Sequence, residues 1–256
     1  MNPAVACGFD IGSSSTKVVI IDAGKNIIYK LIEPTHPRIE DQAVELLKKL
    51  ELAGISAHSL PIVATGYGRK LMAIAQKQVT EITCHAKGVY EFFKHGGSLI
   101  DIGGQDSKVI HIGDNGRVLD FAMNDKCAAG TGRFLENTSA RLAIPIEEIG
   151  FAAENAQGEA QISSTCTIFA ESEIISLLAH GEKVEVILKG LHRSLTKRIV
   201  AMVNSISSSN PFMLSGGVVQ NSAIRSMLAE ALGTQLLLPE YPQFMGAYGA
   251  ALVALS

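Results

Sequence analysis

The sequence predicts an α/β protein built from two related lobes, and an internal repeat is the first reason. Residues 8–19 (GFDIGSSSTKVV) and residues 99–110 (LIDIGGQDSKVI) share a strand pattern that ends in Asp-Ile-Gly, a polar turn, a lysine and a β-branched run. A hairpin turn follows each copy, at residues 23–26 and 113–116. Two copies are too few for a solenoid, so we expect two similar lobes that face each other.

Composition agrees with this fold class and excludes several functions. The chain has 256 residues, of which 47% are hydrophobic and 18% charged, enough for one large domain or two lobes with real cores. The net charge of −3 and the lack of a basic run predict no nucleic-acid partner. No apolar run is long enough to cross a bilayer, and no signal peptide is evident, so we expect a cytoplasmic protein without a membrane partner.

Hydrophobic periodicity assigns the elements of the first lobe, which we place at residues 1–96. The predicted strands cover residues 5–11, 18–22, 27–32 and 60–64. A glycine turn follows at residues 65–69, and the predicted helices cover residues 39–52, 70–75 and 81–93.

The second lobe, residues 97–256, is mainly helical after its copy of the repeat. Strands are predicted at residues 118–123, 211–214 and 235–238. Helices are predicted at residues 131–142, 168–179, 184–206, 219–232 and 245–255, with a short one opened by Pro145. We expect the last helix to pack back on the first lobe.

Glycine turns after strands are candidate phosphate sites. They occur at Gly12–Thr16, at Gly103-Gly104 and at Ser215-Gly216-Gly217. Glycine permits close backbone approach, and consecutive N–H groups form a nest for an anion. One such turn alone is most simply a tight hairpin. The matched pair, joined by a third turn of the strand–Gly-Gly–helix type, predicts a polyphosphate site.

Two aspartates end the repeated strands and are candidate magnesium ligands. Asp10 and Asp101 are placed to hold Mg²⁺ through water, because Mg²⁺ usually keeps several of its waters. Lys17 follows in the first copy, either as a phosphate contact or as an ordinary solvated strand lysine.

Cys127 and Cys166 each precede a helical pattern, where unpaired N–H groups and the helix dipole favour a thiolate. No histidine is spaced as a base for either thiol, and a disulfide is disfavoured in the cytoplasm. A metal centre and incidental thiols stay open. Iron–sulfur clusters generally take four thiolates, which two chains related by a two-fold axis would supply. Cys7 and Cys84 are expected to be small buried hydrophobes.

The glycine turns resemble those of the actin, Hsp70 and sugar-kinase ATPases. Residues 10–16 resemble the first phosphate loop, 101–104 the second, 214–217 the adenosine motif and 246–249 a late contact near the base. The resemblance implies two ribonuclease-H-like lobes with ATP or ADP in the cleft and Asp10 and Asp101 as catalytic residues. The implied nucleotide contacts are Gly12, Ser13, Ser14, Ser15, Thr16, Lys17, Gly103, Gly104, Gly216, Gly217, Gln220 and Gly246.

Both cysteine motifs resemble the signatures of the 2-hydroxyacyl-CoA dehydratase activators, or archerases, which are related to the ATPase subunits of benzoyl-CoA reductase. The motifs are NDKCAAGTGRF at residues 124–134 and SSTCTIFAESE at residues 163–173. The resemblance implies a homodimer with one 4Fe-4S cluster ligated by Cys127 and Cys166 of both chains. ATP hydrolysis would then drive a low-potential electron from a ferredoxin or flavodoxin donor into a dehydratase-like iron–sulfur enzyme.

The role of Gln105 and the function of the chain each have alternatives. Gln105, beside the second phosphate turn, is either the residue that orients the attacking water or a loop residue that bonds backbone. The predicted strand at residues 118–123 would connect that turn to Cys127. Alternative functions are a small-molecule kinase, for a sugar or an acid, and a nucleotide-gated binding module without turnover.

Overall fold

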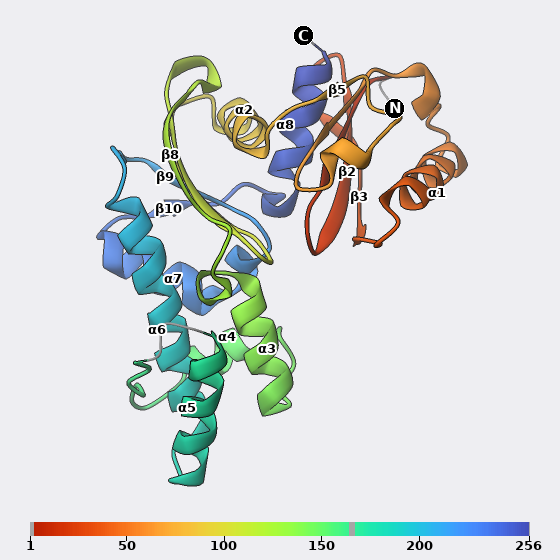
Figure 1. Ribbon diagram of the computed structural model, residues 1–256. Coiled ribbons are helices and arrows are strands. Elements are labelled where there is room, and N and C mark those ends of the chain that lie inside the picture. Colours follow the sequence, from red (N-terminus) through yellow and green to blue (C-terminus); the bar gives the residue numbers. More distant parts are fainter. Residues whose placement is uncertain (1–2, 164–166, 256) are drawn as a thin grey trace. The chain divides into compact units, whose positions relative to one another are not determined.

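A computed structural model describes residues 3–163 and 167–255 of the chain (Figure 1). The chain forms two compact units. The first comprises residues 1–96, 112–119 and 239–256, and the second comprises residues 97–111 and 120–238.

The first unit contains a five-stranded sheet of order β3-β2-β1-β4-β5. Its strands are β1 (Ala4–Ile11), β2 (Ser15–Asp22), β3 (Ile27–Pro34), β4 (Ile62–Thr65) and β5 (Lys77–Gln78). β1, β2 and β3 form an antiparallel meander, whereas β4 runs parallel to β1 and β5 parallel to β4.

Helices of the first unit pack against β1 through side chains that alternate along that strand. They are α1 (Ile39–Leu52) and α8 (Met245–Ala254), whereas α2 (Glu81–Phe93) packs against α8. Cys7 and Phe9 of β1 share a core with the apolar stripe of α1, which includes Leu46 and Leu50. Gly8, between them, faces α8 so closely that a Cβ there would clash with the Ala247 carbonyl.

The second unit repeats this topology with a sheet of order β10-β9-β6-β7-β8. Its strands are β6 (Gly97–Ile102), β7 (Ser107–Ile112), β8 (Val118–Asn124), β9 (Phe212–Ser215) and β10 (Leu236–Leu237). β9 runs parallel to β6 and β10 parallel to β9, as β4 and β5 do in the first sheet. The duplicated α/β fold that the sequence repeat predicts is therefore confirmed.

The helices of the second unit are α3 (Gly132–Leu142), α4 (Ile149–Glu154), α5 (Thr167–Ala179), α6 (Val184–Val203) and α7 (Ser222–Leu232). α6 is central to the core, because Ile187, Leu191, Leu195 and Ile199 along its length are fully buried. Short 3-10 helices connect the elements of the two units, at Ala57–Ser59, Arg69–Leu71, Asp114–Gly116, Ala128–Gly130, Val218–Gln220 and Pro242–Phe244.

Three predicted helices differ from those in the structure. The short helix predicted to open at Pro145 begins only at Ile149, as α4. The segment predicted as a helix at residues 70–75 forms only the 3-10 turn Arg69–Leu71, because the chain then turns Met72 into the core and leads into β5. Sheet pairing overrides helix propensity there. The helix predicted at residues 219–232 is divided, because the Asn221 side chain caps α7 by accepting from the Ile224 N–H at 3.2 Å.

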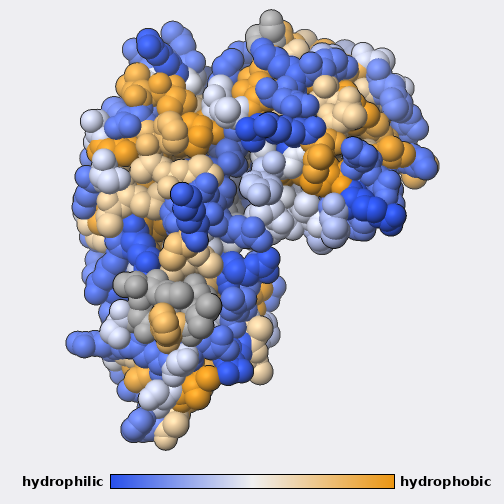
Figure 2. All heavy atoms as spheres, viewed as in Figure 1, coloured by the Kyte–Doolittle hydropathy of each residue, from blue (hydrophilic) through white to orange (hydrophobic). Residues whose placement is uncertain are grey.

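Surface side chains are mixed in character. Hydrophilic and hydrophobic residues are interspersed over the face seen in Figure 2. The apolar side chains with more than half of their area exposed are Leu52, Tyr67, Leu71, Leu119, Phe121, Phe151 and Phe169. None of the helices in the described ranges is long and apolar enough to cross a membrane.

Candidate nucleotide site and cysteine loop

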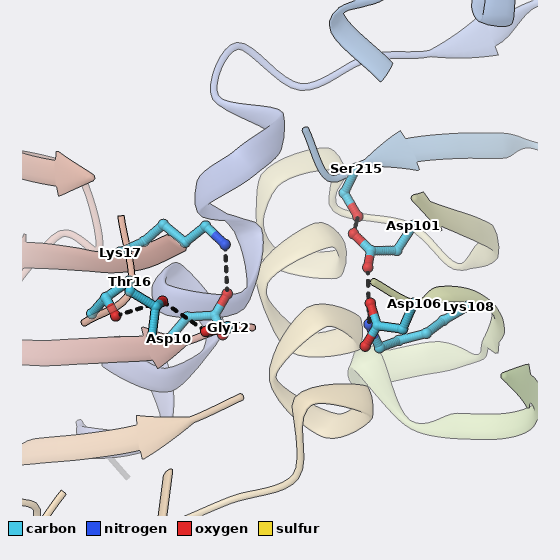
Figure 3. A network of polar contacts seen from close by, with 9 residues as sticks. Asp10, Gly12, Thr16, Lys17, Asp101, Asp106, Lys108 and Ser215 are labelled. Atoms are coloured by element: carbon cyan, nitrogen blue, oxygen red, sulfur yellow. Dashed lines mark hydrogen bonds and ion pairs between the residues drawn. The ribbon is translucent and has the colours of Figure 1, made fainter. Parts of the chain in front are cut away.

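The first phosphate turn connects β1 to β2 and carries a buried carboxylate. Asp10 is 5% exposed, and its cross-strand partner Lys17 brings Nζ to 3.9 Å from Asp10 Oδ2 (Figure 3). The Gly12 N–H donates to the Ser15 carbonyl at 3.1 Å and closes the turn. A Cβ on Gly12 would approach Lys17 Nζ to 3.2 Å, so glycine leaves room for the ammonium.

The second phosphate turn, between β6 and β7, has the same construction. Asp101 is 2% exposed and lies 3.3 Å from Lys108 Nζ, and the Gly103 N–H donates to the Asp106 carbonyl at 2.9 Å. Lys108 follows Asp101 by the same number of residues as Lys17 follows Asp10. Lys17 but not Lys108 is among the residues predicted from the sequence, although the repeat itself is the signal that identifies Lys108 as a site residue.

The second carboxylate is held more tightly than the first. Ser215 Oγ donates to Asp101 Oδ1 at 2.6 Å, and Lys108 Nζ also lies 2.9 Å from Asp106 Oδ1 (Figure 3). Ser215 ends β9, so one hydrogen bond joins the second phosphate turn to the third glycine turn. These contacts bring Asp101, Gly103, Gly104, Gly216 and Gly217 together in one unit.

Hydroxyl groups of the first turn divide into two kinds. Ser14 Oγ is buried and has no hydrogen-bond partner among the described residues. Thr16 Oγ1, by contrast, lies 3.1 Å from Thr35 Oγ1 and donates to Gln42 Oε1 at 3.1 Å. Its hydroxyl therefore braces the turn from behind. Ser13 is exposed, and Ser15 is half-buried.

Two glycines bring backbone close to Asp10 within the first unit. Gly66 has φ +88°, and a Cβ there would lie 2.5 Å from Asp10 Oδ1. A Cβ on Gly246, in the first turn of α8, would lie 2.8 Å from both Asp10 Oδ2 and His85 Nε2. The structure therefore adds His85 and Gly66 to the surroundings of Asp10. The glycine turn at residues 65–69 is the sequence signal for Gly66, whereas His85 belongs to no motif.

The third glycine turn joins β9 to the helices behind the sheet. Gly216 has φ +92° and lies so close to the Ile102 carbonyl that a Cβ would clash with it. Gln220, in the 3-10 turn that follows, is exposed, as is Gln105 in the second phosphate turn. Both amides are thus accessible to a ligand or to water.

Cys127 is an exposed thiol in a loop that Asn124 holds. The Cys127 N–H donates to Asn124 Oδ1 at 3.1 Å, and Asn124 Nδ2 donates to the Cys127 carbonyl at 2.7 Å. Cys127 precedes the 3-10 turn Ala128–Gly130, and α3 begins only at Gly132.

The amides at the start of α3 are occupied, contrary to the expectation that they face the thiol unpaired. The Gly132 N–H donates to the Gly103 carbonyl at 2.9 Å, and the Arg133 N–H donates to the Gly104 carbonyl at 2.7 Å. The helix therefore begins on the second phosphate turn, and a Cβ on Gly132 would approach the Gly103 carbonyl to 3.2 Å. Sequence patterns do not reveal backbone-to-backbone bonds of this kind.

The other cysteines differ from Cys127 in burial. Cys7 and Cys84 are fully buried, as predicted; burial raises the pKa of Cys84 to about 12 and raises that of Cys7 further. Cys166 lies outside the described residues. Within residues 3–163 and 167–255, no group of three or more His, Cys, Asp or Glu side chains could hold a metal ion. Cys127 is the exposed soft donor of this part of the chain.

Comparisons with known proteins agree with these features. The chain is 41% identical over 248 residues to the 2-hydroxyisocaproyl-CoA dehydratase activator of Clostridioides difficile, covering 96% of this chain and 93% of the relative. The structure of that activator with bound ADPNP has a TM-score of 0.91, at 40% identity, over 98% of this chain and 94% of the other.

A more distant structure shows the fold alone. A ROK family glucokinase from Streptomyces griseus, solved with glucose and AMPPNP, has a TM-score of 0.62 at 15% identity, over 98% of this chain and 99% of the kinase. The actin, Hsp70 and sugar-kinase fold class is thereby confirmed. The model of the BadF/BadG/BcrA/BcrD ATPase family matches residues 7–254, and the chain therefore belongs to that family of ATPases.

Proposed function

We propose that this protein is an ATP-dependent electron-transfer activator of a 2-hydroxyacyl-CoA dehydratase-like iron–sulfur enzyme. The single observation that carries the proposal is the start of α3 on the second phosphate turn, through the Gly132–Gly103 and Arg133–Gly104 hydrogen bonds. This contact connects a candidate nucleotide turn to the loop of an exposed cysteine within one compact unit. The names of close relatives, which are activators of dehydratases, support the same function.

The three glycine turns bind different parts of the nucleotide in this proposal. Backbone amides of residues 13–15 and of Gly104 bind the phosphates, because the Gly12 and Gly103 N–H groups already close the two turns. Lys17 and Ser14 add side-chain donors. Gly216, Gly217 and Gln220 bind the adenosine part. Gln105 is exposed beside the second turn and orients the attacking water.

We assign Asp10 and Asp101 to a magnesium ion that would be held through water. Each carboxylate is nearly buried and already faces a lysine ammonium, at 3.9 Å and 3.3 Å. Direct coordination would displace the lysine, whereas a water shell leaves the ion pair intact. Mg²⁺ retains waters readily, so both aspartates orient its hydration shell.

Cys127 fits one ligand position of a cluster shared by two chains. Its thiol is exposed, its backbone is fixed on both sides by Asn124, and one chain's described residues supply no second thiolate beside it. We assign the remaining ligand of each chain to Cys166. A 4Fe-4S cluster, when bound, supplies a low-potential electron, and each protomer of a homodimer contributes two thiolates.

Coupling requires that ATP favour one arrangement of the cysteine loop over another. A ligand shifts a conformational equilibrium only by its differential affinity for the two states. Any movement of residues 103–104 on binding the phosphates is passed to α3 through two short backbone bonds. The Cys127 loop then moves with α3.

The test is activation of a purified 2-hydroxyacyl-CoA dehydratase under anoxic conditions. Reduced ferredoxin or flavodoxin serves as donor, with ATP and Mg²⁺ present. We expect dehydratase activity to appear only with this protein and hydrolysable ATP. Cys127→Ser should abolish activation, whereas the control Cys7→Ala, at a buried thiol, should retain it. Phosphate transfer to a sugar or an acid, without activation, would contradict the proposal and favour a kinase.

A further inference from the structure

A chain of buried polar contacts lies behind the third glycine turn. His192 on α6 is fully buried, with Nδ1 2.7 Å from the Leu188 carbonyl and Nε2 2.9 Å from Asn221 Nδ2. A carbonyl oxygen only accepts, so Nδ1 carries the proton and Nε2 accepts from the Asn221 amide. The imidazole is therefore neutral, in one defined tautomer.

Asn221 connects His192 to the third glycine turn. Its Oδ1 accepts from the Ile224 N–H at 3.2 Å, which caps α7, while its Nδ2 is held by His192. α4 encloses the same side chain, because a Cβ on Gly150 would lie 2.7 Å from Asn221 Oδ1. Asn221 ends the segment from Gly216 and begins α7, so its orientation fixes the exit of the turn.

Arg225 holds the same turn from its outer side. Its Nη1 donates to the Val219 carbonyl at 2.7 Å and to the Gln220 carbonyl at 2.8 Å. At the other end, Gly216 lies against the Ile102 carbonyl of β6. The backbone of residues 216–221 is therefore fixed at both ends and in the middle.

We propose that His192, acting through Asn221, is a positioning residue for the nucleoside part of ATP. The inference rests on the proposed function, which assigns residues 216–220 to adenosine. His192 has no contact with the phosphate turns at residues 12–16 and 103–106 in the hydrogen bonds that the structure describes. Loss of its acceptor nitrogen should therefore weaken nucleoside binding and leave phosphate binding nearly unchanged.

The experiment compares variants that differ only in this acceptor. His192→Leu removes it at similar volume, and His192→Gln offers an amide oxygen in its place. Asn221→Ser keeps the cap of α7 but is too short to reach His192. His180→Ala is the matched control, because His180 Nδ1 also bonds the carbonyl four residues earlier, that of Ser176 at 2.7 Å, on an exposed helix face.

Affinity for ATP and for inorganic triphosphate is measured for each variant of the full-length protein, with kcat and KM for ATP hydrolysis. We expect His192→Leu and Asn221→Ser to bind ATP about fivefold to tenfold more weakly, the loss expected for one hydrogen bond. The double variant should be no weaker than either single one. Triphosphate affinity should change less than about twofold, KM should rise more than kcat falls, and His192→Gln should recover affinity.

Other outcomes overturn the inference. Unchanged ATP affinity in both Asn221→Ser and His192→Leu would overturn it. An equal loss of affinity for ATP and for triphosphate would overturn it too. If His192→Leu does not fold, Asn221→Ser against wild type decides. Failure of the wild-type protein to bind ATP would instead overturn the proposed function.

Discussion

The Gly132 N–H donates to the Gly103 carbonyl at 2.9 Å, so α3 begins on the second phosphate turn. The adjacent Arg133 N–H makes the corresponding bond to Gly104 at 2.7 Å. Because both bonds are between backbone groups, their geometry depends on how closely the two segments approach. Gly132 permits this approach, since a Cβ there would lie 3.0 Å from Val218 Cγ2 and 3.2 Å from the Gly103 carbonyl.

A side chain at Gly132 should uncouple the nucleotide turn from the cysteine loop. Gly132→Val would push α3 away from residues 103–104 and lengthen both bonds. We expect the variant to bind ATP within about threefold of wild type but to lose most of the ATP-induced change in the alkylation rate of Cys127. Gly233→Asn is the control, because Gly233 has φ +63°, which asparagine tolerates, and open space around it. An undiminished ATP response in Gly132→Val would contradict the coupling.

Thiol reactivity should separate the described cysteines into two groups. Alkylation of the metal-free protein near pH 8, mapped by mass spectrometry, should modify Cys127 rapidly. Cys7 and Cys84 should react only in denaturant, because burial excludes the reagent and raises the pKa of Cys84 to about 12. Rapid native modification of Cys84 would mean that α2 and α8 are not packed as the structure shows.

The two repeated lysines should differ in their contribution to stability. Lys108 is 2% exposed and lies between Asp101 and Asp106. The Lys17 side chain is 15% exposed and, among the described residues, pairs with Asp10 at 3.9 Å. Lys108→Met leaves the buried Asp101 carboxylate and the partly exposed Asp106 carboxylate without this cation, and it should lower the free energy of unfolding by about 3–5 kcal/mol. Lys17→Met, its matched counterpart, should cost less, because its pair with Asp10 is longer, at 3.9 Å, and Lys17 is partly solvated. Urea denaturation of both variants measures this difference, and equal losses would contradict it.

Stability should fall on acidification through His192. Burial lowers the pKa of His192 below its ordinary value of 6.5, outweighing the opposing effects of the Leu188 carbonyl, Glu154 and Asn221. The unfolded chain then binds more protons than the folded one between the two pKa values, so stability decreases as pH falls below about 6.5.

The free energy of unfolding should fall by up to about 1.4 kcal/mol per pH unit for one proton. This loss stops below the pKa of His192 in the folded state. Urea denaturation from pH 8 to pH 5 should show a shallower slope in His192→Gln than in wild type. His180→Ala, at an exposed histidine, should keep the wild-type slope. Parallel curves for His192→Gln and wild type would contradict this account.

The sequence predicted the duplicated topology because repeat and periodicity are local signals. The turns after the two Asp-Ile-Gly copies connect β1 to β2 and β6 to β7 as the repeat predicts, and α1 begins and ends where its apolar stripe predicts. The helix predicted at residues 70–75 was wrong, since a local pattern does not show that Met72 and β5 join the core of the sheet. The α3 contact with Gly103 was not predictable for the same reason, because only the tertiary fold brings two backbones together.

Candidate site residues were predictable to the extent that chemistry requires particular side chains. Asp10, Asp101 and Cys127 carry such groups, and the exposed thiol and buried carboxylates agree with that interpretation. His192 and Asn221 were missed because they act on the turn from behind, through contacts between α6 and α7. Such residues have no motif of their own.

The central claim is a cluster shared by two chains, and iron analysis tests it most directly. The protein is purified without oxygen, and iron, acid-labile sulfide and native mass are measured together for wild type and Cys127→Ser. The account predicts a brown dimer with about two irons and two sulfides per chain, and loss of iron in Cys127→Ser. A colourless, iron-free monomer, or unchanged iron in Cys127→Ser, would contradict it.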